Sequence, residues 1–312
     1  KPNYFIKEKL SPLASLRKVL KENHMETTPL PPMAAGMFGY FGYDMITLFE
    51  KIKINQIDDL NLHDSILIRP SIVAIFDRLK DTITISVQIR KKEWKNSLDA
   101  WDFASHKINN IKEKLNFPLD FKTLIYNKKS LLKPKSNLTK SKFLSIVKKA
   151  KNYIKRGDIF QIVLSIRFVI PFVKDTFTLY RSLRRLNPSP FLFHFSLGNF
   201  SIIGSSPEIL VRLREKTVTI RPVAGTRPRG KNKIEDQKNV INLLSDVKER
   251  SEHLMLLDLG RNDVGRVSKS NTVKVTSNFD VEFYSHVMHI ASEVSGKIRD
   301  EYDALDALKA GF

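Results

Sequence analysis

The stretch ERSEHLMLLDLGRND occupies residues 249–263 and sets a short apolar run between charged clusters. It lies inside a pattern of apolar spacing that predicts a helix over 233–264. Strand-like segments come in runs before and after this region, rather than in strict alternation with helices. That grouping predicts an α+β fold. The expected strands cover 71–79, 82–89, 159–169, 191–197, 200–205, 208–214, 217–223, 272–276 and 282–296.

A segment without strong periodicity separates two parts of the chain. It contains Pro118, Pro134 and several lysines, which is typical of a linker. The helix after it is expected to begin with Ser141 as its N-cap and to end at Gly157. Further helices are expected at 11–22, 97–115 and 175–186. The expected domains are an N-terminal region over 1–115, a linker over 116–137 and a second domain over 138–312.

The composition excludes several classes of protein. The chain has 312 residues, of which 42% are hydrophobic, so it can bury a sizeable core. It has no cysteine, which excludes a disulfide framework and fits a cytoplasmic location. No apolar run approaches the length that spans a bilayer, so we expect no membrane partner.

The formal net charge of +20 raises the question of nucleic-acid binding. Much of this charge comes from lysines between Arg90 and Arg156, whereas proteins that read bases favour the fork of arginine. No nucleic-acid-binding motif accompanies the charge. We therefore expect a solvated lysine-rich face and no nucleic-acid partner. A basic, non-catalytic binding module remains the alternative from another functional class.

Two polar segments lie at expected strand ends in the second half of the chain. Glu208 follows Ser206-Pro207, where a carboxylate could act in chemistry or simply cap a turn. Residues 221–230 are rich in Gly, Pro and Arg, which predicts a fixed loop whose backbone N–H groups could face an anion. A plain surface loop is the alternative for this segment.

Two further segments carry potential metal ligands or proton-transfer groups. Glu249 and Glu252 are three residues apart, so they share one face of the expected helix. Carboxylates suit Mg²⁺, although charges on a long helix are commonly solvated or ion-paired. His286 and His289 would fall on opposite faces of a strand, which argues against a two-histidine metal site.

Taken together and in this order, these motifs closely resemble those of the chorismate-utilising enzymes, and among them the anthranilate synthase large components. The likeness extends across 137–312 and more weakly into 1–115. The resemblance implies an α+β fold in which helices pack on the outer faces of β-sheets. It also implies a lyase of tryptophan biosynthesis, which converts chorismate and ammonia to anthranilate and pyruvate. The motifs lie at 157–161, 187–191, 206–208, 222–230, 251–263 and 284–289.

Two positions distinguish members of this family. Isochorismate and salicylate synthases carry a lysine base at the position of Gln161. Aminodeoxychorismate synthases typically carry a lysine nucleophile at the position of Ala224. The absence of both lysines resembles the anthranilate synthase pattern, in which ammonia is the nucleophile. Aminodeoxychorismate synthase component I remains the alternative within the family.

The resemblance also implies roles for individual residues. Glu208 would be the general acid for the departing hydroxyl, and His289 would assist removal of a ring proton. Gly225 and Thr226 would hold the substrate. Glu252 would be a ligand of Mg²⁺, the expected cofactor. Glu249 would lie near the ion without binding it directly.

The family's regulation and partners are implied in the same way. Pro190, Phe191 and Leu192 match part of the site at which tryptophan acts as feedback inhibitor. A glutamine amidotransferase subunit, component II, would supply the ammonia. The match begins and stops part-way through the family's pattern, so we expect a fragment that lacks both ends, has a C-terminally incomplete catalytic domain and is inactive alone.

Overall fold

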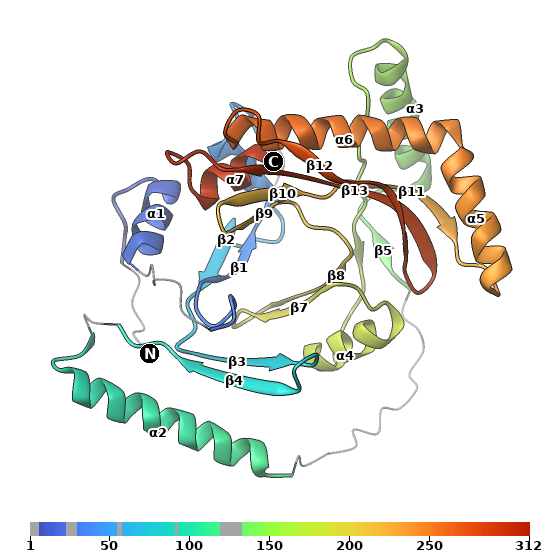
Figure 1. Ribbon diagram of the computed structural model, residues 1–312. Coiled ribbons are helices and arrows are strands. Elements are labelled where there is room, and N and C mark those ends of the chain that lie inside the picture. The colour runs from blue at the N-terminus through green and yellow to red at the C-terminus, as the bar shows by residue number, and fades with distance from the viewer. Residues whose placement is uncertain (1–5, 23–29, 55–57, 91–92, 119–132) are drawn as a thin grey trace. The chain divides into compact units, whose positions relative to one another are not determined.

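The computed structural model describes residues 6–22, 30–54, 58–90, 93–118 and 133–312. Its helices and strands are grouped rather than alternating, which confirms the expected α+β class (Figure 1). The chain forms two compact units, one of Lys1–Pro118 with Tyr180–Phe312 and one of Leu119–Leu179. Most of the linker expected over 116–137 lies outside the described residues.

Most elements of the N-terminal part agree with the expected pattern, whereas η1 and β2 were not predicted. Strands β3 and β4 form the predicted antiparallel hairpin, in which Ile72 pairs with Val87 and Asp77 with Thr82. The N-cap of α2 is Asn96, whose side chain accepts a hydrogen bond from the Asp99 backbone. The elements are α1 (Pro12–Glu22), β1 (Phe38–Phe41), η1 (Tyr43–Leu48), β2 (Ser65–Ile68), β3 (Ile72–Asp77), β4 (Thr82–Val87) and α2 (Ser97–Asn116).

The largest sheet is built around the long strand β13 (Val287–Lys297). One edge of β13 pairs with β12 (Lys274–Phe283), and the other pairs first with β11 (Val223–Pro228) and then with β10 (Thr217–Ile220). All these pairings are antiparallel, and β9 (Arg212–Arg214) extends the sheet beyond β10. Because β10 and β11 are consecutive and share one edge of β13, they behave as one strand interrupted at two residues.

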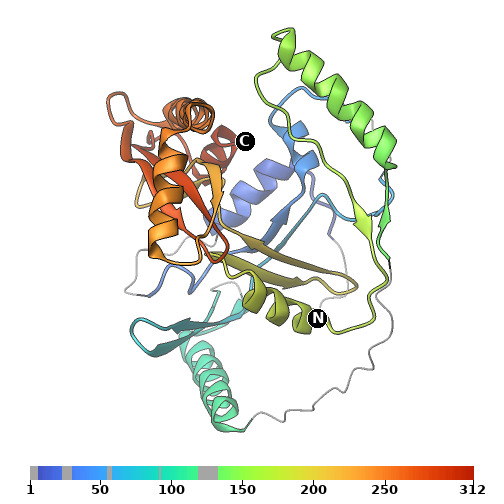
Figure 2. The ribbon, with the colours of Figure 1, turned by 90° about the vertical axis from the view of Figure 1, so that its right-hand side faces the viewer.

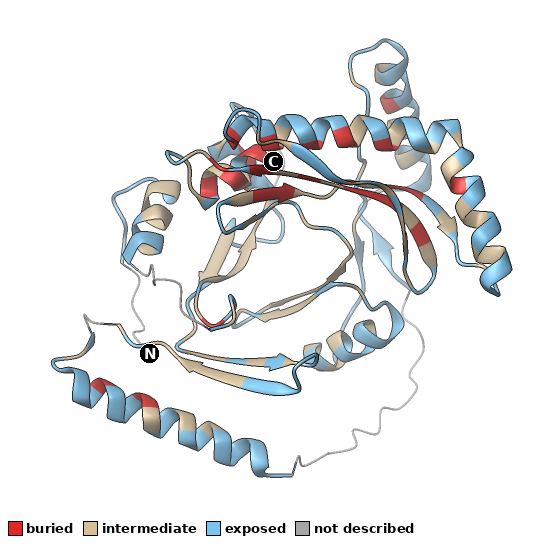
Figure 3. Cartoon of the chain, in the orientation of Figure 1, coloured by how far each residue is buried: buried red, intermediate tan, exposed pale blue. Residues whose placement is uncertain are grey.

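Helix α6 (Val247–Val267) packs on β10, β11 and β13. Its buried residues recur at alternating spacings of four and three, so they form one stripe facing the sheet. This stripe packs with strand residues and with α7 (Ala304–Ala310) in the principal core. Figure 3 shows the buried residues concentrated on α6, α7 and the strands of this sheet. The stripe consists of His253, Leu257, Gly260, Val264 and Val267.

The helix expected over 233–264 is in fact two helices. α5 (Lys233–Ser245) ends at Asp246, whose extended backbone starts α6 in a new direction. Figures 1 and 2 show α5 and α6 meeting at a sharp bend beside β11. The Asp246 side chain accepts hydrogen bonds from the backbone of Lys248 and Glu249, so it caps α6. The apolar periodicity continues across this cap and conceals the break.

Three further expectations about strands and loops are also wrong. The loop expected over 221–230 contains strand β11, because these residues complete the edge of β13. The strand expected over 282–296 is divided by a turn at 284–286, where the backbone N–H of Tyr284 bonds to the carbonyl of Val287. The strand expected over 208–214 is confined to β9.

The helix and two strands between residues 176 and 206 follow the expected pattern closely. α4 (Thr176–Leu186) is followed by the antiparallel hairpin of β7 (Phe191–Ser196) and β8 (Ser201–Ser206). In this hairpin, Phe191 pairs with Ser206 and Ser196 with Ser201. The polar segment that contains Glu208 therefore begins where β8 ends.

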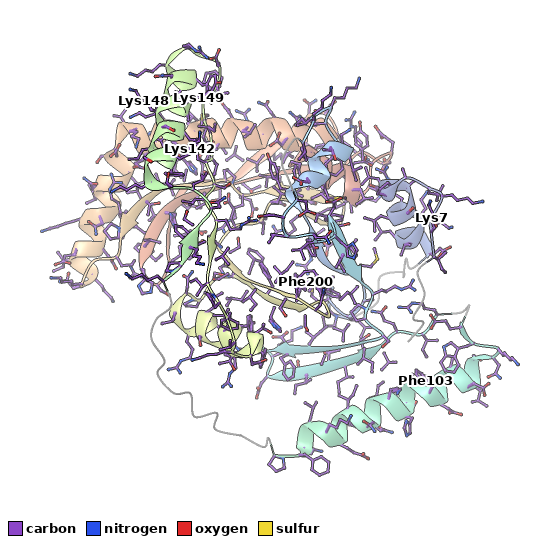
Figure 4. The ribbon with its side chains drawn as sticks, turned by 180° about the vertical axis from the view of Figure 1, so that it is seen from behind. Lys7, Phe103, Lys142, Lys148, Lys149 and Phe200 are labelled. Carbon is purple, nitrogen blue, oxygen red and sulfur yellow. The ribbon has the colours of Figure 1, made fainter. Side chains whose placement is uncertain are left out.

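The smaller unit contains α3 (Lys140–Lys155) and the short pair of β5 (Lys135–Ser136) and β6 (Phe168–Val169). The N-cap of α3 is Thr139 rather than the expected Ser141, while Gly157 has the left-handed backbone expected after a helix end. Lys142, Lys148 and Lys149 project from α3 (Figure 4). The strand expected over 159–169 is wrong except at β6, because the remaining residues have no strand partner within the described chain. Within the described ranges, no helix combines the length and apolar character that a bilayer crossing needs.

Candidate active site

A β-bulge at Gly225 shapes the centre of the site. The register of β11 against β13 shifts between Ala224 and Thr226, so Gly225 is the extra residue. Its φ of +72° lies in the left-handed region, where glycine carries no side-chain penalty. A Cβ at this position would lie 3.2 Å from Leu243 Cδ1 and 3.3 Å from Ile290 Cδ1. Backbone conformation and packing therefore both favour glycine at position 225.

The bulge directs two oxygen atoms towards His289. The Gly225 carbonyl oxygen and Thr226 Oγ1 each lie 3.0 Å from His289 Nδ1. A carbonyl oxygen can only accept a hydrogen bond, so the arrangement favours the tautomer with its proton on Nδ1. The Nε2 atom of this neutral ring then carries a free lone pair. This tautomer can accept a proton at Nε2.

A series of contacts runs from His289 through Tyr284 and Glu282 to Arg221. The Tyr284 ring packs edge-on against His289 with centroids 5.4 Å apart. The Tyr284 hydroxyl donates to Glu282 Oε2 at 2.9 Å, and Glu282 forms an ion pair with Arg221. Arg221 belongs to the interruption between β10 and β11. The imidazole is therefore held between the bulge and the turn that connects β12 to β13.

Glu208 lies in a turn after β8. Its backbone N–H donates to Ser206 Oγ at 3.3 Å, and the same hydroxyl donates to the Glu208 carbonyl at 3.1 Å. The residue as a whole is exposed, yet protein atoms crowd its carboxyl enough that loss of hydration raises its pKa. A hydrogen bond from the Val223 backbone and the charges of His289 and Arg221 oppose this rise without cancelling it. Glu208 is thus a carboxyl group suited to proton donation, within electrostatic reach of His289.

A cavity of about 360 Å³ lies beside Glu208. Helix α6 contributes a second carboxyl group, Asp263, whose pKa is also raised by burial. Asp263 belongs to the 251–263 motif, and no separate role was predicted for it from the sequence. Most of the remaining lining is apolar, which restricts water around both carboxyl groups. The remaining lining residues are Ser206, Ile209, Leu210, Ile220, Pro222, Leu256, Leu259, Gly260 and Gly311.

Glu252 is the residue whose environment best fits a metal ligand. It is partly buried on α6, and its carboxylate has no hydrogen-bond or ion-pair partner among the described residues. Oxygen from one carboxylate, completed by substrate and water, is a donor set that suits Mg²⁺. Glu249 differs, because Arg227 already engages its carboxylate at 3.4 Å. Within the described ranges, no three His, Asp or Glu side chains gather as a metal site.

Arg227 and Asp246 also belong to this region, although neither was predicted from the sequence as a site residue. Arg227 forms an ion pair of 2.8 Å with Asp246, the cap of α6. The spacing of Asp246 and Glu249 matches a capping box, in which a short polar residue is followed three positions later by an acid. That pattern was a usable signal for the start of α6.

A buried histidine beside Glu252 anchors α6 to the sheet. His253 is fully buried, and its Nε2 lies 2.7 Å from Ser292 Oγ in β13. The same hydroxyl accepts the backbone N–H of Phe279, whose ring packs edge-on against the imidazole. Burial lowers the pKa of His253, so the ring is held neutral. This contact fixes the rotation of α6 next to Glu252.

The remaining predicted site residues have no contact of their own with His289 among those that the described part of the chain shows. Ala224 is buried in β11 and pairs with Ile290, whereas Gln161 belongs to the smaller unit. His286 lies in the turn before β13, not on the strand, with Nε2 3.3 Å from the Leu186 carbonyl. The two histidines are therefore separated by the turn rather than by strand alternation.

Of the predicted tryptophan-site residues, Phe191 and Leu192 begin β7, and Pro190 lines a second cavity of about 510 Å³. Tyr284 also lines this cavity and contacts His289. The other lining residues are Pro188, Ser189, Arg229, Phe283 and Ser285.

Comparisons with known proteins identify relatives of the chain. The chain is 46% identical over 302 residues to the anthranilate synthase component 1 of Cereibacter sphaeroides, a match that covers 96% of this chain and 60% of the relative. It is 42% identical over 317 residues to the protein of the same name from Aquifex aeolicus, covering 100% of this chain and 63% of the relative. The chain thus spans about three-fifths of the length of these curated relatives.

A solved structure shows the same fold. The crystal structure of anthranilate synthase component I from Streptococcus pneumoniae superposes with a TM-score of 0.86 at 35% sequence identity. The match covers 97% of this chain and 66% of that one. The sequence model of the chorismate binding enzymes matches residues 4–312. The resemblance inferred from the motifs is therefore confirmed, and the chain belongs to the chorismate binding enzyme family.

Proposed function

We propose that the chain is the chorismate-binding part of an anthranilate synthase component I, which converts chorismate and ammonia to anthranilate and pyruvate. The similarity to relatives of that name supports this assignment. The side chains at the two distinguishing positions support it further. Ala224 offers no nucleophile and Gln161 offers no lysine base, so ammonia remains as the attacking group.

The observation that carries the proposal is that two oxygen atoms lie 3.0 Å from His289 Nδ1. The Gly225 carbonyl and Thr226 hydroxyl engage Nδ1 and leave Nε2 free to accept a proton. A base of this kind suits the second half of the reaction, in which a ring proton must be removed. The bulge at Gly225 thus places two oxygen atoms of β11 beside the base expected on β13.

The reaction has two steps, and both involve proton transfer. In the first, the nitrogen of ammonia bonds to C2 of chorismate while the C4–oxygen bond breaks. Glu208 donates its proton to the departing hydroxyl, which leaves as water. The proton that Glu208 gives up is balanced by the one that the new nitrogen substituent loses. A raised pKa suits this role because the carboxyl group retains its proton closer to neutral pH.

The second step forms the aromatic ring. The proton at C2 passes to His289 Nε2, the C3–oxygen bond breaks, and the enolpyruvyl group leaves as the enolate of pyruvate. This enolate takes up one proton at its methylene carbon to become pyruvate, which balances the proton removed from the ring. Tyr284 holds the imidazole edge-on, which keeps the ring oriented for this transfer. Gly225 and Thr226 form the strand segment beside which the substrate is expected to bind.

Glu252 would hold Mg²⁺. Its partly buried carboxylate, without a partner among the described residues, supports this role. The ion would supply positive charge for a carboxylate of the substrate. The buried contact of His253 with Ser292 keeps the neighbouring Glu252 at a fixed rotation of α6.

Ammonia delivery and feedback inhibition belong to the same proposal. A glutamine amidotransferase subunit would supply the ammonia, as the resemblance implies. Tryptophan would bind at Pro190, Phe191 and Leu192, and the cavity of about 510 Å³ beside Pro190 supports this position. Tyr284 offers a direct contact between this cavity and His289.

The experiment that tests the proposal separates its two steps. The whole protein, including the length that its relatives possess, is incubated with chorismate, an ammonium salt and Mg²⁺. His289→Gln is expected to accumulate the amino intermediate without releasing pyruvate, while His286→Gln still forms anthranilate. Glu252→Gln and EDTA should each abolish turnover. Full turnover by both Glu252→Gln and His289→Gln would refute the assigned roles.

A further inference from the structure

Arg227 connects three parts of the chain at the start of α6. Its Nε donates to Asn242 Oδ1 at 2.7 Å near the end of α5, and Nη2 donates to Asp246 Oδ2 at 2.8 Å. Its Nη1 donates to the Thr226 carbonyl at 2.9 Å and lies 3.4 Å from Glu249 Oε1. The side chain is only 21% exposed. Protein acceptors therefore occupy most of the guanidinium donors.

The Glu249 carboxylate lies between Arg227 and the bulge. One oxygen faces Arg227, and the other, Oε2, would be 3.3 Å from a Cβ placed on Gly225. The Glu249 side chain is only 18% exposed. A poorly hydrated negative charge thus lies directly beside the residue that is expected to hold the substrate.

This placement creates an electrostatic problem for the proposed substrate. Chorismate carries two carboxylate groups, and like charges repel more strongly at poorly hydrated positions than in water. Arg227 offsets part of the charge of Asp246 and Glu249, with which it forms ion pairs. Without the guanidinium, the Glu249 carboxylate beside the bulge would have no ion-pair partner among the described residues.

We propose that Arg227 is a positioning residue that holds Glu249 in place and offsets its charge, so that the bulged strand β11 accepts a dianionic substrate. It does so through Glu249 rather than by touching the substrate. This inference rests on the proposed function, because it takes chorismate as the anion bound at Gly225.

The test compares chorismate binding by the whole protein and its variants. The Kd is measured by isothermal titration calorimetry without ammonia, and KM and kcat are measured with ammonia. Arg227→Gln is expected to raise both Kd and KM by about tenfold or more at low salt, and by less at high salt. Arg227→Gln with Glu249→Gln should bring the Kd back to within about threefold of the wild type. Arg261→Gln is the control, because it removes an exposed ion pair with Asp258 on α6, the helix that also carries Glu249. Its Kd should match that of the wild type.

The outcomes separate the possible roles of Arg227. Equal binding by the wild type and Arg227→Gln would overturn the inference while leaving the proposed function intact. Failure of the double variant to recover would show that Arg227 acts directly on the substrate, which would also overturn it. Failure of the wild type to bind chorismate would refute the proposed function itself. If Arg227→Gln does not fold, Arg227→Lys keeps the charge with fewer donors, and a Kd within about threefold of the wild type is expected.

Discussion

Thr226 Oγ1 lies 3.0 Å from His289 Nδ1, across the seam between β11 and β13. The two residues are register partners because the bulge at Gly225 absorbs one extra residue of β11. Without the bulge, the side chain at position 226 would point to the opposite face of the sheet. A single backbone irregularity therefore joins the substrate-binding segment to the expected base.

Gly225→Ala should destabilise the fold and lower activity. A left-handed residue with a Cβ costs about 1–2 kcal/mol, and the new atom would also crowd Leu243 and Ile290. Urea unfolding of the whole protein measures the loss. Gly265→Ala is the matched control, because Gly265 lies in α6 with open space around it. It should stabilise by about 0.5–1 kcal/mol, and an equal effect of both substitutions would contradict the role of the bulge.

Ser292→Ala should lower the free energy of unfolding by about 1–3 kcal/mol, because it leaves His253 Nε2 and the Phe279 N–H without their partner. Thermal or chemical unfolding measures this loss. Ser295 lies on the same strand, and its hydroxyl has no hydrogen bond among the described residues. Ser295→Ala should therefore change the free energy of unfolding little. Equal stability of the two variants would show that α6 does not depend on the buried contact.

The raised pKa of Glu208 has a consequence for stability. Because the folded protein binds this proton more tightly than the unfolded chain, the stability contributed by the protonated carboxyl is fully present below the ordinary value of 4.5. It is lost as the pH rises through the folded pKa. The wild type should therefore lose stability relative to Glu208→Gln as the pH rises above 4.5. Urea unfolding of both proteins across this range provides the measurement, and parallel curves would contradict the raised pKa.

Activity should respond to the same substitution. Glu208→Gln removes the proton donor and should lower kcat by roughly 10²–10⁴-fold. Glu215→Gln, in the exposed turn between β9 and β10, is the control and should leave kcat unchanged. A Glu208→Gln variant with a normal kcat would assign the proton donor elsewhere, and Asp263 on the same cavity would be the next carboxyl group to test.

Local patterns in the sequence predicted most elements well. The alternation around Lys80 and Asp81 predicted the β3–β4 hairpin, and helical spacing predicted α1, α2 and α4. The pattern failed at Asp246, because apolar periodicity continues through a bend that depends on side-chain capping. The local pattern failed also at 221–230. Its Gly and Pro residues predict a loop, and the sequence does not reveal the strand with which these residues pair. The partner β13 lies more than fifty residues further along the chain.

The candidate site shows the same division between local and long-range information. The motifs predicted roles for Glu208, Thr226, Glu252 and His289, but the spacing of these residues in the sequence conveys nothing about their contacts. The tautomer of His289 depends on a carbonyl oxygen 64 positions away, which no side-chain pattern indicates. Arg227 was present in its motif, but its ion pairs with α6 required the tertiary structure.

The most direct test of the account is product analysis on the whole protein with chorismate, an ammonium salt and Mg²⁺, with anthranilate and pyruvate quantified together. Equal molar amounts of both products are expected, formed without a protein nucleophile at Ala224. Aminodeoxychorismate or isochorismate without pyruvate, or no product from chorismate, would contradict it.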